Sequence, residues 1–241
     1  MSAENTGTVE VAREGDIAIV TIRREHKRNA LSTAMEARLA EQLASPQVMT
    51  SRAVIVTGGD QVFSAGADVT ELREMTPDAI AAYYRASGAV YEQLARLPMP
   101  TIAAITGYCL GGGLELALAA DFRIADDTAT FGFPEVGLGI LPSSGGVART
   151  VRMVGPARTR DLVLRGRRFD AASAESWGLV TEVTSAGRHG DAARRLAEEL
   201  VAAPPLALTF TTQVIDAAAE SSHRTALLLE QLAYAALNRT D

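Results

Sequence analysis

Three consecutive glycines, Gly111 to Gly113, stand directly before an apolar run that carries one carboxylate, Glu115. Glycine is a poor helix former, so three of them at the start of an expected helix need a reason other than helix stability. The first N–H groups of a helix are unpaired, and glycines leave them open to a ligand. With the positive end of the helix dipole, these donors suit a developing negative charge such as an oxyanion.

A second turn of this kind spans residues 64–67, where Gly66 lies between small residues and lets a ligand reach the main chain. Backbone donors from the two turns could hold one carbonyl oxygen. A second carboxylate, Glu135, follows an expected strand end. Two carboxyl groups, one protonated and one ionised, are a recurring device for proton transfer. A single glutamate is more often a solvated surface residue, but the leucines around Glu115 fit a surface position poorly.

The sequence around Gly111 to Gly113 matches neither of two common phosphate-binding patterns. A P-loop needs Lys and then Ser or Thr after its last glycine, where this chain has Leu114 and Glu115. The glycines at 107 and 111–113 do not form G-x-G-x-x-G, and a carboxylate would repel a bound phosphate. We therefore expect no nucleotide cofactor. With Cys109 as the only cysteine and three scattered histidines, we expect no metal site either.

The composition is that of an ordered globular protein. The chain has 241 residues, 47% of them hydrophobic and 22% charged, which favours one domain with a full core. No apolar run reaches the roughly 20 residues that a membrane span requires. The formal net charge of −6 argues against a nucleic-acid partner. A single cysteine fits a reducing compartment, so the cytoplasm is the expected location.

Seven arginines gather between residues 149 and 168. They are Arg149, Arg152, Arg158, Arg160, Arg165, Arg167 and Arg168. Such a run is usually a solvated helix face or a subunit interface. The alternative is an anion site for a phosphorylated ligand.

The order of the elements predicts an α/β fold with mostly parallel strands and a helical end. Expected strands span residues 9–12, 17–22, 53–57, 101–105, 121–125 and 130–133. Expected helices span residues 31–43, 77–97, 112–120, 156–166, 170–178, 192–202 and 206–237. Pro46 is expected to close the first helix, and Asp68 with Glu71 to form a capping box. The glycine clusters fall where strands end and helices begin, which is where α/β folds place ligands.

Taken together, these segments resemble the enoyl-CoA hydratase/isomerase (crotonase) superfamily over nearly the whole chain. The segments that carry the resemblance are RNAL at 28–31, FSAGAD at 63–68, ITGYCLGGGLEL at 105–116, DFRIA at 121–125, FPEVGLG at 133–139, LP at 141–142, GG at 145–146 and GLV at 178–180. The resemblance implies a spiral of ββα units over residues 1–188 and a helical region for assembly over 189–241, one domain overall. It also implies an acyl-CoA thioester as the ligand and a homotrimer or dimer of trimers.

The same resemblance assigns roles to residues. The backbone N–H groups of Ala67 and Gly112 would form the oxyanion hole, and Glu115 and Glu135 would flank the substrate double bond. Retention of both glutamates favours a hydratase, with Glu115 as the base and Glu135 as the acid. Coenzyme A would be part of the substrate, not a cofactor. The substrate-binding residues would be Lys27, Arg28, Ala30, Ala65, Gly66, Asp68 and Gly111.

Three points stay open at this level. The loop that begins at Ser143 and Ser144 departs from the family pattern and borders the expected site. The segment 72–84 would border the acyl pocket, although apolar residues at helical spacing are more often core. The alternatives to a hydratase are a double-bond isomerase that uses Glu135 alone and a non-catalytic acyl-CoA-binding protein.

Overall fold

The structure, a computed structural model, describes residues 7–238. Its strands are β1 (Thr8–Glu14), β2 (Ile17–Arg23), β3 (Ala53–Thr57), β4 (Thr101–Ile105), β5 (Tyr108–Leu110), β6 (Phe122–Asp126), β7 (Thr130–Gly132), β8 (Arg168–Asp170) and β9 (Glu182–Thr184). Its helices are α2 (Thr33–Leu43), α3 (Pro46–Met49), α4 (Val69–Glu74), α5 (Pro77–Ala95), α6 (Gly112–Ala119), α7 (Gly146–Arg165), α8 (Ala171–Ser176), α9 (His189–Ala202), α10 (Pro205–Glu220) and α11 (His223–Leu237), with 3-10 turns η1 (Glu25–Lys27) and η2 (Glu135–Leu138).

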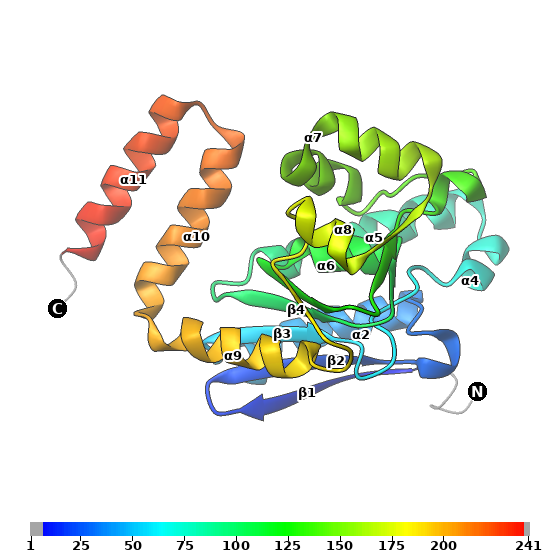
Figure 1. Ribbon diagram of the computed structural model, residues 1–241, viewed down its shortest axis with the longest axis horizontal. Helices are drawn as coiled ribbons and strands as arrows, with labels where there is room; N and C mark the ends of the chain where they lie inside the picture. Colours follow the sequence, from blue (N-terminus) through cyan, green and yellow to red (C-terminus); the bar gives the residue numbers. More distant parts are fainter. Residues whose placement is uncertain (1–6, 239–241) are drawn as a thin grey trace.

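Two sheets carry the fold. The larger has the strand order β1-β2-β3-β4-β6-β9, in which β1 is antiparallel to β2 and the remaining pairs are parallel. The smaller has the order β5-β7-β8. In Figure 1, α9 lies along one face of the large sheet, and α10 with α11 stands away from the rest of the chain. The predicted α/β class with mostly parallel strands is confirmed.

Both faces of the large sheet are buried. Successive strand residues point to opposite faces, so Ile55 and Ile102 pack with α9 while Val54 and Val56 join the main core on the other side. This arrangement explains the continuous apolar runs at 53–57 and 101–105, because a parallel strand covered on both faces has no polar side. Helix α9 shares this core, so the expected boundary between the regions 1–188 and 189–241 falls between elements that pack together. The division into these two regions stays a prediction.

The small sheet brings the two glycine-containing turns together. β5 runs directly into the start of α6, and the N–H of Gly111 donates to Gly132 O at the end of β7 over 2.9 Å. The turn 64–67 lies between this sheet and the start of α2. It is held by single parallel bridges from Ser64 to Cys109 and from Ala67 to Leu31.

Some local expectations were wrong. Pro46 does not merely end a helix: it begins α3, and the Ser45 side chain caps that helix by accepting from Val48 N. Asp68 does cap α4 by accepting from Thr70 N. Glu71, however, does not complete a capping box, because its carboxylate accepts from the N–H and the hydroxyl of Thr33 instead.

Element boundaries also differ from those expected. Helix α7 consists of two helical segments that meet at Gly155, whose φ of 76° is not helical. The second segment, from Pro156 to the C-cap Gly166, is the expected helix, whereas the first segment, which begins at Gly146, was not expected. The expected helix 206–237 is two helices, because Ser222 leaves helical geometry and caps α11. Strands β5, β8 and β9 were not expected; each has three residues and pairs with distant segments.

By length and composition, no single helix within residues 7–238 could cross a membrane. Helices α9 and α10 could do so only as a pair, and they are bent by 108°.

Candidate active site

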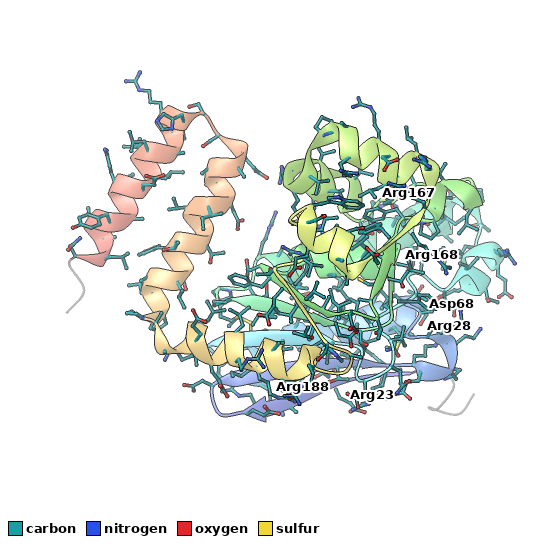
Figure 2. The ribbon with its side chains drawn as sticks, in the orientation of Figure 1. Arg23, Arg28, Asp68, Arg167, Arg168 and Arg188 are labelled. Atoms are coloured by element: carbon teal, nitrogen blue, oxygen red, sulfur yellow. The ribbon has the colours of Figure 1, made fainter. Side chains whose placement is uncertain are left out.

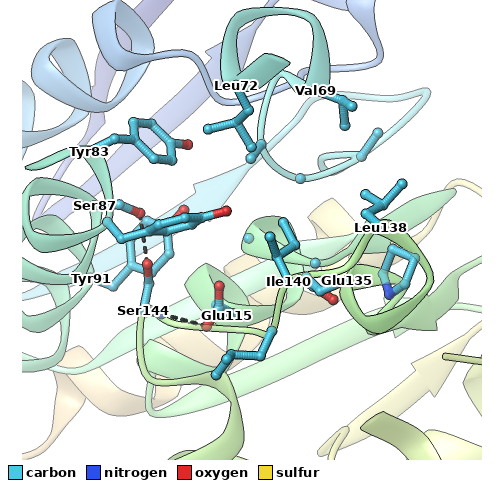
Figure 3. A pocket seen from close by; sticks show the side chains of 18 residues that line it. Val69, Leu72, Tyr83, Ser87, Tyr91, Glu115, Glu135, Leu138, Ile140 and Ser144 are labelled. Atoms are coloured by element: carbon cyan, nitrogen blue, oxygen red, sulfur yellow. Dashed lines mark hydrogen bonds between the residues drawn. The ribbon is translucent and has the colours of Figure 1, made fainter. Parts of the chain in front are cut away.

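A cavity of about 50 Å³ opens where the two glycine-containing turns meet α4, α5 and η2. Figure 3 shows Glu115 and Glu135 on one side of this cavity, with Leu72 and Tyr83 across it. The turn 64–67 and the first residues of α6 complete its wall.

The N–H groups of Ala67 and Gly112 adjoin each other in the cavity wall. A β-carbon at residue 112 would lie only 3.5 Å from Ala67 N. Within the described residues, neither N–H donates a hydrogen bond to the chain. Two adjacent free donors, one of them at the start of α6, can bind one oxygen that carries negative charge. The pairing of these two turns, expected from their glycines, is therefore present.

A network behind the turn 64–67 holds Ala67 in place. Asn29, which is fully buried, donates through its side-chain amide to the carbonyls of Gly58 and Val62. Ser64 donates to Asn29 O over 2.8 Å and accepts from Gly66 N. Because these bonds tie the turn to two other segments, the N–H of Ala67 cannot rotate freely away from the cavity.

Asp68 belongs to the same support. Its carboxylate forms a 2.7 Å ion pair with Arg24, and both side chains are 9% exposed. The Arg24 side chain, through hydrogen bonding and charge, lowers the pKa of Asp68 against the effect of burial. Arg24 also donates to Ala30 O. Asp68, expected to bind substrate, does not line the cavity.

The three glycines at the start of α6 meet three different demands. Gly111 has a φ of 51°, and a β-carbon there would come within 2.7 Å of Glu135 Oε1. At Gly113 a β-carbon would lie 2.6 Å from Ser64 O. At Gly112 it would face the cavity, 3.2 Å from the Tyr91 hydroxyl. Gly111 thus leaves room for Glu135, Gly113 leaves room for the turn 64–67, and Gly112 leaves room for a ligand.

Glu115 is anchored by main-chain donors. It is 3% exposed, and its Oε1 accepts from the N–H groups of Ser144 and Gly146, both over 2.8 Å. Burial raises the pKa of Glu115, and the two N–H donors oppose that rise. A β-carbon at Gly146 would lie 2.7 Å from Glu115 Cγ, so only glycine allows this approach. The unusual loop after Leu141 is therefore the segment that orients Glu115.

Glu135 has a different environment. It begins η2 after Pro134, it is 8% exposed, and its Oε2 has no hydrogen-bond partner within the described residues. Burial raises the pKa of Glu135 to about 7, and the nearby Glu115 charge adds to the rise. A carboxyl group in this state can hold a proton at neutral pH.

The remaining expected substrate contacts fall into two groups. Ala65, Gly66 and Gly111 line the cavity, as does Leu72 of the segment expected at the acyl pocket. Lys27, Arg28 and Ala30 lie outside it.

Arg28 takes part in an arginine–tyrosine cluster at the edge of the small sheet. Its guanidinium lies 5.5 Å from the ring centre of Tyr108, and that of Arg168 lies 5.1 Å from the same ring. Figure 2 marks Arg28 and Arg168 on neighbouring segments, although they are 140 positions apart in the sequence.

Most of the other arginines in the 149–168 group also have partners within the chain. Arg149 pairs with Glu92, Arg152 with Glu220, and Arg165 and Arg167 with Asp161, while Arg158 lies over the Trp177 ring. Four of the seven arginines are therefore ion-paired within the chain, which fits a paired surface better than an anion site for those four, while Arg158 and Arg168 have ring contacts that do not neutralise them.

Sequence patterns did not single out Ser87 and Tyr91 as cavity residues, whereas Ser144 belongs to the loop that was expected to border the site. Tyr83, Ser87 and Tyr91 recur every four residues along α5, which places them on one helix face. A polar stripe on an otherwise apolar buried face is the signal that could have identified them. Within the described residues, no group of three or more His, Cys, Asp or Glu side chains could hold a metal ion.

Backbone donors that are free within the described residues lie beside two buried carboxyl groups, an arrangement that has the groups needed to bind an oxyanion and to exchange protons. The family model for enoyl-CoA hydratase/isomerase matches residues 12–241. A probable enoyl-CoA hydratase of Mycobacterium bovis is 38% identical over 229 residues, which are 93% of this chain and 87% of that protein. The short-chain-enoyl-CoA hydratase of Clostridium acetobutylicum is 36% identical, with coverage of 92% and 86%.

Solved structures agree with the sequence matches. An enoyl-CoA hydratase from Bacillus anthracis superposes with a TM-score of 0.91 at 32% identity, over 97% of this chain and 92% of that one. The chain therefore belongs to the enoyl-CoA hydratase/isomerase family. The expected superfamily, the crotonase-like fold and the expected enzyme class are confirmed.

Proposed function

We propose that the protein adds water across the double bond of trans-2-enoyl-CoA thioesters and forms 3-hydroxyacyl-CoA. The observation that carries the proposal is the pair of N–H groups of Ala67 and Gly112, which have no partner within residues 7–238 and lie beside two buried carboxyl groups in one cavity. The names of the relatives point in the same direction.

In the proposed reaction the thioester oxygen accepts from Ala67 N and Gly112 N. Glu115 takes a proton from water as the water oxygen bonds to C3, and the double-bond electrons move to the thioester oxygen as an enolate. Glu135 then supplies a proton to C2, which restores the thioester carbonyl. Loss of one oxyanion donor typically costs on the order of 100- to 1000-fold in rate.

The surroundings of the two carboxyl groups support this division of roles. Two main-chain N–H groups favour the ionised form of Glu115, which suits a base. Glu135 has an unpartnered buried oxygen and a pKa of about 7, which suits a proton donor at neutral pH. Because the two groups interact, they titrate as a pair.

For the coenzyme A portion, we propose that Lys27 and Arg28 face phosphate groups outside the acyl cavity. Both side chains are exposed, and the contact of Arg28 with the Tyr108 ring holds its guanidinium at the protein surface without neutralising it. Guanidinium groups are suited to phosphate because they donate several parallel hydrogen bonds.

For assembly, we propose a homotrimer or a dimer of trimers built through α10 and α11. These helices expose large apolar side chains, namely Leu206, Ile215, Leu227, Leu228, Leu232 and Tyr234. A cluster of exposed apolar residues on one projecting unit is typical of an interaction surface. The cytoplasmic location and a role in fatty-acid breakdown stay predictions.

The test is a spectrophotometric assay with trans-2-enoyl-CoA substrates of several chain lengths. Hydration removes the absorbance of the conjugated thioester, so that absorbance should fall on adding enzyme. With 3-enoyl-CoA, an isomerase would instead create the conjugated absorbance. Absence of a fall with every chain length would overturn the hydratase proposal, and tight acyl-CoA binding without any turnover would favour the non-catalytic alternative.

A further inference from the structure

A third buried carboxyl group, Glu36, lies behind the cavity wall on α2. It is 3% exposed, and its Oε1 accepts from the hydroxyls of Ser87 over 2.8 Å, Tyr91 over 3.1 Å and Tyr83 over 3.4 Å. All three donors come from α5 and line the cavity, whereas Glu36 does not. Buried glutamates are uncommon unless they are paired, so this position calls for a role.

A chain of hydrogen bonds joins Glu36 to the loop that anchors Glu115. The Ser87 and Ser144 hydroxyl oxygens are 2.9 Å apart, and the Ser144 N–H donates to Glu115 Oε1 over 2.8 Å. Ser87 has one hydroxyl hydrogen; when it donates to Glu36, Ser144 must be the donor to Ser87. Figure 3 shows the Ser87–Ser144 and Ser144–Glu115 bonds one after the other at one side of the cavity.

The direction of these bonds requires an acceptor at residue 36. Three hydroxyl oxygens lie within 3.4 Å of Glu36 Oε1. Tyr83 also has Leu31 O as an acceptor over 3.3 Å, but a leucine at residue 36 would leave the buried Tyr91 hydroxyl without its acceptor and would free Ser87 to reverse its bond with Ser144. The ionisable groups that bear on Glu36 are Tyr83 and Tyr91 of α5 and Glu115 of α6. Burial raises the pKa values of both tyrosines, so they remain neutral hydroxyl donors near neutral pH.

We propose that Glu36 is a positioning residue of this site: through Ser87 and Ser144 it holds the loop 143–146 in the place where its N–H groups orient Glu115. Glu36 does not line the cavity and forms no hydrogen bond with Glu115 within the described residues; beside the charge interaction between the two groups, it reaches Glu115 through these side chains. The effect of Glu36 on the reaction rate rests on the proposed function, in which Glu115 is the base. The effect of Glu36 on the position of the loop 143–146 does not depend on that function.

The test compares Glu36→Leu, Glu36→Gln, Ser144→Ala and the double variant that combines Glu36→Leu with Ser144→Ala. Glu36→Leu removes the acceptor and should lower kcat on the order of 10-fold with KM little changed, because a base displaced by a fraction of an ångström loses its reaction geometry. Glu36→Gln keeps a carbonyl acceptor and should restore most of the rate. The control is Glu41→Gln, an exposed position on the same helix, which should behave as the unaltered protein.

Ser144→Ala removes only the hydroxyl link and keeps the N–H that binds Glu115. We expect it to lower kcat about as much as Glu36→Leu, and the double variant to lose little more, since both act on one chain of contacts. Independent losses that multiply in the double variant would overturn the proposal. So would a Glu36→Gln variant as slow as Glu36→Leu, or unchanged kcat in Ser144→Ala.

Amide hydrogen exchange of residues 143–146 provides a readout that does not depend on turnover. Exchange should be faster in Glu36→Leu and Ser144→Ala, and normal in Glu36→Gln. If the unaltered protein hydrates no enoyl-CoA but the exchange pattern holds, only the proposed function fails. If hydration occurs and exchange is the same in all variants, Glu36 has no positioning role.

Discussion

The loop 143–146 with α6 and the segment 133–138 each present one glutamate to the same cavity, but they hold it differently. On the first side, two main-chain N–H groups bind Glu115 Oε1, and further side chains support the loop. On the second side, Glu135 begins a 3-10 turn, and one of its carboxylate oxygens is buried with no hydrogen-bond partner in the described part of the chain. Burial raises the pKa of both groups, but the N–H donors oppose that rise at Glu115, whereas the pKa of Glu135 rises to about 7. The difference teaches that the donors around chemically identical groups set how readily each one ionises.

Replacing each glutamate by glutamine should produce the largest effects. We expect Glu115→Gln and Glu135→Gln each to lower kcat about 10²- to 10⁴-fold, the usual contribution of a positioned acid or base. Affinity for a saturated acyl-CoA, measured by calorimetry, should change little because neither group is needed to hold the thioester oxygen. A variant that keeps the original kcat would remove that glutamate from the reaction.

The pH dependence of the residual rates separates the two sides further. The acid must keep its proton, so the rate of the unaltered enzyme should fall as pH rises through about 7, the pKa of Glu135. That alkaline fall should persist in Glu115→Gln and disappear in Glu135→Gln. The same fall in both variants would mean that another group supplies the proton.

The stability of the two variants should also differ, by about 1 to 3 kcal/mol at pH 8. The folded pKa of Glu135 is about 7, above its ordinary value of 4.5, so the unfolded state releases the proton first. The stability associated with neutral Glu135 is fully present below about pH 4.5 and is lost as pH rises through about 7. Glu135→Gln removes this loss and should be more stable than the unaltered protein at pH 8.

Glu115→Gln should gain less stability at pH 8 than Glu135→Gln, because main-chain N–H groups already stabilise the Glu115 carboxylate in the unaltered protein. Urea unfolding of all three proteins at pH 5 and pH 8 measures the difference. Equal gains for both variants, or a loss for Glu135→Gln at pH 8, would show that the two carboxyl groups are not held in the different ways described.

Much of the site could be predicted from the sequence because its parts have local signals. Glycines mark the places where the main chain meets a ligand, and apolar runs such as 53–57 mark the strands that end there. Motif resemblance then identified Glu115 and Glu135. Short strands such as β5 and β8 were not predicted, because three residues show too little periodicity and their pairing partners are distant in the chain.

The support of the two glutamates could not be predicted in this way. Ser144 and Gly146 bind Glu115 through backbone N–H groups, and every residue except proline carries one. Glu36 lies in an amphipathic helix next to Met35, and a charged residue in such a helix is expected to face solvent. Its burial follows from the packing of α5 against that face, which the sequence does not show. Contacts that depend on tertiary packing leave no pattern in a single sequence.

Gly111 offers the smallest test of the comparison, since a side chain there would point at the Glu135 carboxylate. Gly111→Ala places a side chain at a φ of 51° and a ψ of −125°, a conformation that L-residues rarely adopt and that costs about 1 to 3 kcal/mol, and sets its β-carbon 2.7 Å from Glu135 Oε1. Glu135 must move, so kcat should fall on the order of 10-fold while the contacts of Glu115 persist.

The matched control is Gly137→Ala in η2, where a β-carbon would meet nothing within 4 Å. That variant should stay within about 0.5 kcal/mol of the unaltered protein, with the same kcat. Thermal unfolding and steady-state kinetics on both variants provide the measurement. If Gly111→Ala retained full activity, Glu135 would tolerate displacement, and the tight fit between Gly111 and its carboxylate would have no part in the reaction.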